Sequence, residues 1–528
     1  MTDVDEAAAR VDPASDAPWR RLDPRMLVVG PLAGLVRLVP VIAVLLFAGR
    51  GEPARIWVAL AIAGLLILTG TVRWRTTRYR ITEDRVELHS GWLRRQRRSV
   101  PRDRIRTVDL TAKLLHRVFG LSVVRVSAAS GSGLEQRGLS LDAVSTAEAE
   151  RLRRKLLERP APAAPRTADP VPTVSEPPAE PPAMLLARLH WSWLRFAPLT
   201  FSALAGIGAV MAALHNLLDD LGVDPRDVPA VDDATDRLVS APVWVGVGVV
   251  GALLLVVAVI GSVVLFAERW WDYRLTREPD GTLRVLRGLL TRRSLSVSEE
   301  RLRGAAISEP LLLRAGRGAQ CHALSTGLGR DTQGGALQPP APRAEAHRVA
   351  SAALREHPLM ITRAPLLRHP RAALLRRLSR AVVPAAVLVA GAWLLGALGA
   401  VPSWLGPASL VLLPLAVLLG LDRYRNLGHT LTGRYLVTRL GSVRRRTVAL
   451  QRSGVIGWTL RQSVFQRRSG LVTVEAVTAA GEGGYHVLDV DAADGVALAD
   501  AATPGLLTPF RAGPTAARSH RPSRAPDA

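Results

Sequence analysis

The sequence of 528 residues contains a single cysteine, Cys321, and aromatic residues make up only 5% of it. One cysteine excludes an intramolecular disulfide and any zinc or cluster site built from several cysteines. Lysine is also scarce, because only Lys113 and Lys155 stand among the 69 basic residues. We interpret this skew as the codon bias of a GC-rich bacterial genome, since selection for the bidentate guanidinium would not remove lysine from solvated surfaces.

Acidic residues are too few to balance the basic ones. The 69 lysines and arginines against 45 aspartates and glutamates give a net charge of +24. This balance excludes an acidic solvating protein and indicates an anionic partner, either nucleic acid or phospholipid. Hydrophobic residues make up 48% of the chain and the mean hydropathy is +0.16. We therefore expect several domains and a membrane.

Long apolar runs are plentiful, and a bilayer core of about 30 Å needs roughly 20 helical residues. Runs of this length come in three pairs, near 31–49, 56–72, 196–217, 242–267, 381–400 and 403–421. The first 25 residues have neither an apolar core nor a small-residue cleavage site. We therefore predict that the first span serves as its own anchor and that no cleavable signal precedes it.

Charges near the ends of the spans predict the orientation. Four arginines follow the second span within 73–80, whereas the segment 218–241 is rich in aspartate. By the positive-inside rule, both termini and the three large polar regions are cytoplasmic, in a multi-pass protein of the cell membrane. For Arg37, inside the first run, we expect an interfacial helix over 26–37 and a snorkelling side chain. The alternative is a functional charge within the bilayer.

One unit occurs three times along the chain. Each copy has a basic lead-in, two apolar spans and a polar region of about 80 to 100 residues, as expected for a repeat architecture. Nine prolines within 160–182 favour an extended linker. The predicted divisions are an N-terminal tail (1–25), three transmembrane hairpins (26–72, 184–267, 359–421), three cytoplasmic domains (73–159, 268–358, 422–505), a linker (160–183) and a disordered tail (506–528).

The polar regions begin as short alternating strands. In the first, Tyr79–Leu88 and Leu121–Ala128 have the period of half-buried strands, and residues 142–158 change to helical spacing. A helix near 344–355 ends the second copy, and the third has a weaker ending near 492–502. Positions that correspond among the copies are Tyr79, Tyr273 and His429, and then Gly91, Gly288 and Gly441. We predict an α+β membrane protein with six transmembrane helices in three hairpins, each followed by a β-barrel or sandwich capped by a C-terminal helix.

The stretch 79–126 carries a recognisable motif. Its Y-x-[IL]-T hairpin, V-P-x-x-R-I run and L-x-R-x-F-G-L segment resemble the bacterial pleckstrin-homology-like (PH-like) domain of the YdbS/YdbT membrane-protein family. The resemblance is partial in the other copies; Arg314-Ala315-Gly316 departs from the Arg-x-Phe-Gly signature. It implies seven-stranded, helix-capped barrels that face the cytoplasm and a link to bacteriocin resistance. It implies no catalytic residues.

Patterns typical of catalysis are missing from the sequence. The 11 histidines are scattered and form no HxxxH or HExxH pair. The glycine pairs in 131–133 and 316–318 are too short for a nucleotide-binding loop, and we interpret them as turns. Cys321 is interpreted as inert packing. We therefore expect no enzyme, no metal and no cofactor.

Arginines gather soon after the corresponding glycine in each copy. Near anionic headgroups each cation contributes on the order of 1 kcal/mol. The candidate membrane-surface or ligand contacts are Arg94, Arg95, Arg97, Arg98, Arg102, Arg104, Arg106, Arg292, Arg293, Arg444, Arg445 and Arg446, with Arg287 beside the second group. The alternative is that positive-inside bias alone produces such clusters. Nucleic acid is not expected, because only Trp92 is interleaved with these cations.

Two functions are compatible with these features. The first is a membrane protein whose three PH-like domains bind lipid headgroups of an anionic phospholipid membrane or a protein partner in the membrane. Such a protein would be a scaffold or would act in envelope stress and antimicrobial-peptide resistance. The second is a component of a transporter or efflux system, which would need polar or discontinuous helices at the midplane. The apolar runs contain no buried acid, so we favour the first.

Overall fold

The computed structural model describes most of the chain in segments. These are residues 18–34, 53–82, 85–91, 95–102, 105–128, 139–157, 183–200, 242–326 and 335–507. The chain divides into two compact units. Unit 1 consists of Met1–Leu302, Leu312–Gln320 and Ser325–Ala353, and unit 2 of Arg303–Leu311, Cys321–Leu324 and Leu354–Ala528. The residues expected to form the second domain are thus divided between the units.

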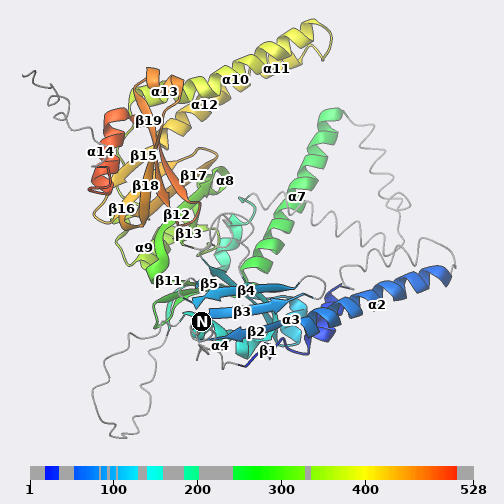
Figure 1. The fold of residues 1–528 in the computed structure, drawn as a ribbon. Helices are drawn as coiled ribbons and strands as arrows, with labels where there is room; N and C mark the ends of the chain where they lie inside the picture. The colour runs from blue at the N-terminus through cyan, green and yellow to red at the C-terminus, as the bar shows by residue number, and fades with distance from the viewer. Residues whose placement is uncertain are drawn as a thin grey trace, which may run out of the picture. The chain divides into compact units, whose positions relative to one another are not determined.

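Long apolar helices are present in both units (Figure 1). The long helices are α2 (Pro53–Thr76), α7 (Val243–Trp270), α10 (Arg371–Ala397) and α12 (Leu412–Arg425), which follows the short α11 (Leu405–Ser409). Within the described residues, Trp244–Trp270, Arg371–Ala397 and Leu405–Arg425 are long and apolar enough to cross a membrane. The sequence predicts spans at all three places.

Of the other three expected spans, one is a helix in the structure and two lie mostly outside the described residues. Helix α2 covers the expected span 56–72 and exposes Leu65 and Leu68, as a lipid-facing helix would. The spans expected near 31–49 and 196–217 fall mostly outside the described residues, as do Arg37 and both termini. The six-span arrangement and the cytoplasmic termini therefore stay predictions.

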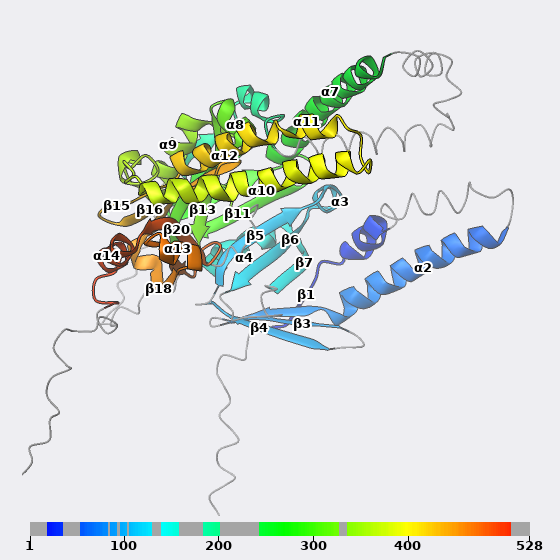
Figure 2. The ribbon, with the colours of Figure 1, turned by 90° about the horizontal axis from the view of Figure 1, so that it is seen from above.

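Helices α10 and α12 pack side by side in unit 2 (Figure 2). A Cβ atom on Gly420 of α12 would lie 3.2 Å from the Cα atom of Leu378 in α10. Glycine at this position lets the two backbones approach closely, which is how small residues act where apolar helices meet in membranes.

The polar regions of the three copies contain a similar succession of short elements. The first copy has β1 (Arg20–Arg21), β2 (Arg78–Ile81), β3 (Arg85–Ser90), β4 (Gln96–Pro101), β5 (Ile105–Ala112), α3 (Leu114–Val118), β6 (Leu121–Ala128), β7 (Leu139–Ser145) and α4 (Thr146–Leu157). The second has β8 (Met184–Arg188), η4 (Trp191–Phe196), β9 (Arg274–Arg277), β10 (Thr282–Arg287), β11 (Arg292–Ser298), η6 (Glu299–Arg301), β12 (Leu302–Pro310), α8 (Leu311–Ala315), β13 (Gly318–Ser325), β14 (Ala341–Pro342) and α9 (Arg343–Leu354).

The third copy has η7 (Pro358–Met360), β15 (Gly428–Leu431), β16 (Tyr435–Leu440), β17 (Arg444–Gln451), η8 (Arg452–Gly454), β18 (Val455–Arg461), α13 (Val464–Arg468), β19 (Leu471–Thr478), β20 (Gly484–Asp491) and α14 (Ala492–Ala502). In place of a lead-in strand, Leu367 forms an isolated bridge with His429.

Two of the sheets contain strands from two successive copies. The strand orders are β1-β2-β3-β4, β7-β6-β5-β11-β10-β9-β8, β14-β13-β12-β17-β16-β15 and β18-β19-β20. In unit 1, β5 of the first copy pairs antiparallel with β11 of the second. In unit 2, β12 pairs antiparallel with β17 of the third copy. The resemblance implies separate seven-stranded barrels, whereas here edge strands of neighbouring copies join into longer sheets.

The glycine that follows the first hairpin has the same conformation in each copy. Gly91, Gly288 and Gly441 have φ angles of 105°, 109° and 100°. A Cβ atom on Gly441 would lie 2.0 Å from the carbonyl oxygen of Arg444, and one on Gly288 would lie 2.0 Å from that of Thr291. Only glycine fits such a turn, which explains why the repeat is visible in the sequence.

One local expectation differs from the structure, and one departure from the motif proves to keep its backbone conformation. Residues 142–145 are not helical, because Ser145 pairs with Leu121 as the last residue of β7. Helix α4 begins at Thr146, and Ser145 Oγ accepts a hydrogen bond from the Glu148 amide at 3.3 Å. In the second copy, the position of Gly120 is taken by Arg317, which has a φ of 57°. The left-handed turn is thus kept where the signature is lost.

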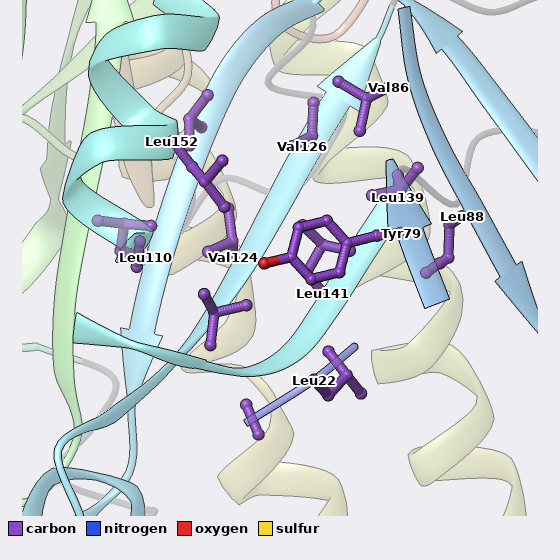
Figure 3. Close-up of a cluster of buried hydrophobic side chains, with 14 of the residues drawn as sticks. Leu22, Tyr79, Val86, Leu88, Leu110, Val124, Val126, Leu139, Leu141 and Leu152 are labelled. Atoms are coloured by element: carbon purple, nitrogen blue, oxygen red, sulfur yellow. The ribbon is translucent and has the colours of Figure 1, made fainter. Parts of the chain in front are cut away.

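A compact apolar core lies in the first copy (Figure 3). Tyr79 from β2 points toward Val124 of β6 and Leu141 of β7, and Leu152 of α4 belongs to the same cluster. The alternating residues of the sequence are therefore the ones that pack inward. Tyr273 and His429, which correspond to Tyr79, are also buried.

A buried carboxylate connects helix α10 to the third copy. Asp489 of β20 has no solvent exposure, and it accepts hydrogen bonds from the guanidinium groups of Arg376 and Arg377. Gln466 of α13 also donates to it at 2.8 Å. The first residues of an apolar helix are thus held by charge pairing to the folded module.

Two histidines extend this network. Nδ1 of His369 lies 3.2 Å from the carbonyl oxygen of Asp489, so it must donate. Its Nε2 is then the acceptor for Nδ1–H of His429, also at 3.2 Å. Burial lowers the pKa of both rings, and that of His429 falls to about 4. Both rings are therefore neutral at physiological pH.

Because both histidines are buried in the neutral form, we expect unit 2 to be sensitive to acid. An unfolded histidine takes up its proton near pH 6.5, so unit 2 should lose stability as the pH falls from 6.5 toward 4 and regain it as the pH rises. The shift of His429 alone corresponds to about 3 kcal/mol. Hydrogen exchange of β15 and β20 against pH measures this loss, and His429→Gln should flatten the profile. The same slope in the variant would show that other groups cause it.

Candidate membrane-docking site

The first arginine cluster lies along a sheet edge. Arg97 and Arg98 belong to β4, the last strand of its sheet, and both are exposed, as is Arg95 just before the strand. Arg102 instead donates a hydrogen bond to the carbonyl oxygen of Lys155. The exposed arginines present three cations at a strand edge. Of the other expected residues, Arg94 and Arg104 fall outside the described part of the chain, and so does the side chain of Arg106.

A cavity of 760 Å³ adjoins this edge. One wall is apolar and comes from α2, where Leu68 and Val72 line it. The other side carries Gln96 and Arg98 of β4 and Asp142 of β7. The cavity therefore combines an apolar helix face with charged and amide groups, the two properties that an amphiphilic ligand needs.

The second cluster lies where β11 meets β5. Arg292 and Arg293 pair with Ala112 and Thr111 and remain exposed. Arg287 is buried, and its guanidinium carbon lies 4.3 Å from the ring centroid of Trp270. Burial lowers the pKa of Arg287 to about 10, so the group stays charged at neutral pH. This cation contributes to packing beside α7.

The third cluster has protein partners. Arg444 donates to Ser308 Oγ at 2.9 Å, and Arg446 pairs with Glu482 at 2.6 Å. Arg445 makes a bidentate pair with Glu309, at 2.7 and 2.8 Å. The contacts of Arg444 and Arg445 join β17 to β12, whereas Arg446 pairs with a residue between β19 and β20. Contact between these arginines and lipid headgroups remains a prediction.

Exposed apolar side chains on the short helices are a feature that sequence reasoning missed. Helix α3 exposes Leu114 and Val118, and α13 exposes Val464 and Phe465. Helix α8 exposes Leu312 in the corresponding place. In the sequence, these apolar residues stand a few positions before the left-handed residue that precedes the next strand. A helix of five residues is too short for hydrophobic periodicity to identify it, so the sequence alone does not predict these helices.

Cys321 lies in β13 and is fully buried. Burial raises the pKa of its thiol to about 12. Since the thiolate is the nucleophilic form, this side chain is unreactive at neutral pH and acts as packing.

The geometry and the comparisons with known proteins define the class. The family of bacterial PH domains matches residues 32–160 and 382–501, the first and third copies with their preceding apolar segments. The chain is thus a membrane protein that carries bacterial PH domains. It is 23% identical over 429 residues to the UPF0699 transmembrane protein YdbT of Bacillus subtilis (strain 168), a match that covers 80% of this chain and 84% of the relative. The resemblance to the YdbS/YdbT family is confirmed, and none of the solved structures matches.

Proposed function

We propose that this protein is a membrane-anchored scaffold whose first PH-like domain docks on the anionic inner leaflet. Arg95, Arg97 and Arg98 are the contacts, and the cavity between α2 and β4 holds part of a lipid. A role in envelope stress or resistance to antimicrobial peptides would follow from such attachment.

One observation carries the proposal. The cavity is lined both by the apolar helix α2 and by Arg98 and Gln96 of β4, so the exposed arginines lie next to a helix expected to span the bilayer. At that depth they fall within a Debye length of the headgroups, where surface cations are effective. In the third copy, the corresponding arginines are engaged by Glu309 and Glu482 instead.

The short apolar helices support the same placement. Ser463, which caps α13, accepts a hydrogen bond at 3.3 Å from Arg376 in the first turns of α10. Phe465 of α13 is exposed beside it. An exposed phenylalanine beside arginines at the start of an apolar helix suits insertion of the ring below the headgroups of the membrane surface.

Fluorescence transfer in lipid nanodiscs tests the docking. The full chain carries a donor on Ser99→Cys, an exposed position of β4, and the lipids carry headgroup acceptors. We expect higher transfer with phosphatidylglycerol than with phosphatidylcholine and a decline with salt. Arg97→Gln with Arg98→Gln should lower the docked population by about tenfold or more, since each cation contributes on the order of 1 kcal/mol.

A double variant of equal charge is the control. Arg151→Gln with Arg154→Gln removes two exposed arginines from α4 of the same domain. Transfer should stay at the level of the unmodified chain. Equal transfer in both lipids, or equal loss in both double variants, would contradict the proposal.

A further inference from the structure

An exposed apolar pair stands where the joint of β5 with β11 ends. The register of this joint, continued past the end of β5, places Leu114 of α3 opposite Leu290. Leu114 is 50% exposed and Leu290 is 48% exposed. Arg117 of α3 attaches the two segments, because its guanidinium donates a hydrogen bond at 3.0 Å to the carbonyl oxygen of Leu289. Side chains from two successive copies thus contribute to one apolar surface.

The joint of β12 with β17 ends in the same way. Its register continues to Leu311 and Val443, and the Leu311 amide donates a hydrogen bond at 2.7 Å to the Val443 carbonyl oxygen. These residues are 46% and 49% exposed. Leu311 is the first residue of α8 as Leu114 is of α3, and each partner stands two residues after its turn glycine. Single exposed apolar residues are ordinary on a protein surface, but this pair recurs at the same position of two joints.

The turn that carries the second member of each pair is bound to the end of an apolar helix. In unit 1, the Leu289 amide donates a hydrogen bond at 2.8 Å to the carbonyl oxygen of Glu268 in α7. In unit 2, the Ser442 hydroxyl donates one at 2.6 Å to the carboxylate of Asp422 in α12. Both helices belong to segments long and apolar enough to cross a membrane. Since a spanning helix ends near the headgroups, each exposed pair is expected at the membrane surface.

We propose that these two apolar pairs insert into the bilayer surface beside the ends of α7 and α12, below the lipid phosphates. Val118, one helical turn after Leu114, is 73% exposed and enlarges the first pair. Arg117 and Arg292 are exposed close to this pair in the sequence. Such cations extend to the headgroups while the apolar side chains beside them enter the acyl region.

The partner is therefore the acyl-chain region of the bilayer, and the inference goes beyond the docking of β4. Insertion of an apolar surface gains free energy from the apolar area that leaves water, so it does not need anionic lipid. Each pair takes one residue from each of two copies. Insertion would consequently attach both members of a joint to the membrane at once.

Depth-dependent fluorescence quenching of the full chain tests the insertion. The chain carries a bimane fluorophore on Leu290→Cys and is reconstituted at high salt in phosphatidylcholine vesicles with nitroxides on the upper acyl chains. Cys321 is fully buried and leaves the introduced cysteine as the labelled one. We expect quenching about threefold or more above that of a probe on Pro279→Cys, an exposed residue before the other end of β10.

Two double variants separate insertion from a general effect of apolar residues. Leu114→Ser with Val118→Ser removes exposed side chains and should lower the quenching of the Leu290 probe to that of the second probe. Met184→Ser with Leu185→Ser also removes two exposed apolar side chains of unit 1, from β8 at the far end of β9. This control should leave the quenching unchanged.

Four results would overturn the proposal. One is equal quenching of the two probes by the acyl-chain nitroxides, and another is an equal loss in both double variants. A third is a Leu290 probe that is shielded from aqueous iodide without quenching by the acyl chains, which would show that protein covers the pair. The fourth is quenching that requires phosphatidylglycerol and low salt, which would attribute it to the docking of β4.

Discussion

Replacing Asp489 by asparagine is expected to weaken unit 2 by about 3–5 kcal/mol, the usual loss when one partner of a buried ion pair is removed. The carboxylate is fully buried, and two guanidinium groups from α10 donate to it. Asparagine keeps the size and tolerates the left-handed backbone at this position, where φ is 56°. The change therefore isolates the loss of the negative charge beside Arg376 and Arg377.

Hydrogen exchange in β19 and β20 of the purified chain in detergent measures this effect as a local opening free energy. Asp494→Asn is the matched control, because Asp494 is an exposed residue of α14 in the same module. It should change the opening free energy by no more than about 0.5 kcal/mol. If Asp489→Asn had an equally small effect, the ion pairs of Asp489 with Arg376 and Arg377 would not be what attaches α10 to the third copy.

Replacing Glu309 by glutamine is expected to open the joint between β12 and β17, with a loss of about 3 kcal/mol or more. Glu309 is buried, with its side chain 2% exposed, and Arg445 reaches it through both ends of its guanidinium fork. Glutamine leaves the arginine charge without its counterion and provides only one acceptor in place of two.

The neighbouring pair on the same strand is the control. Arg446 pairs with Glu482 at 2.6 Å, but the Glu482 side chain is 40% exposed. Exposed pairs contribute about 0–1 kcal/mol, so Glu482→Gln should have little effect. Faster hydrogen exchange should appear in β12 and β17 for Glu309→Gln alone. Similar exchange in both variants would mean that backbone pairing holds the joint without the buried pair.

Local structure was readable from the sequence where one residue type alone satisfies the backbone. The glycines at 91, 288 and 441 share a positive φ that excludes other residues, and so they mark the repeat. Three apolar runs correspond to α7, α10 and the segment Leu405–Arg425, since hydropathy over about 20 residues is a strong signal. The predicted helix 142–158 begins later in the structure, at Thr146, because the residues before it pair with β6.

Long-range pairing was not readable. Asp489 stands in an alternating strand, where its neighbours give no sign that it is buried, and its partner Arg376 is 113 residues away. Glu309 and Arg445 are 136 residues apart. The sequence presents Arg444–Arg446 as a cluster of cations, and nothing local separates an arginine that pairs with a buried acid from one that faces lipid.

The joining of strands from successive copies gives the arginine clusters different roles. The cations of β17 are used to close a joint, those of β11 border one, and those of β4 are left on an edge with no neighbouring strand among the described residues. One duplicated motif thus supplies both structural ion pairs and a candidate docking surface. The difference comes from which strand edge is occupied.

Hydrogen exchange of the full chain in nanodiscs, compared between phosphatidylglycerol and phosphatidylcholine, tests the central claim most directly. The account predicts slower exchange for residues 95–101 in the anionic lipid, and equal, slow exchange for β5, β11, β12 and β17 in both lipids. The account would be contradicted if exchange of β4 were the same in the two lipids while exchange of β12 and β17 depended on the lipid. The lipid would then contact the joint between β12 and β17, and the exposed arginines of β4 would have no part in docking.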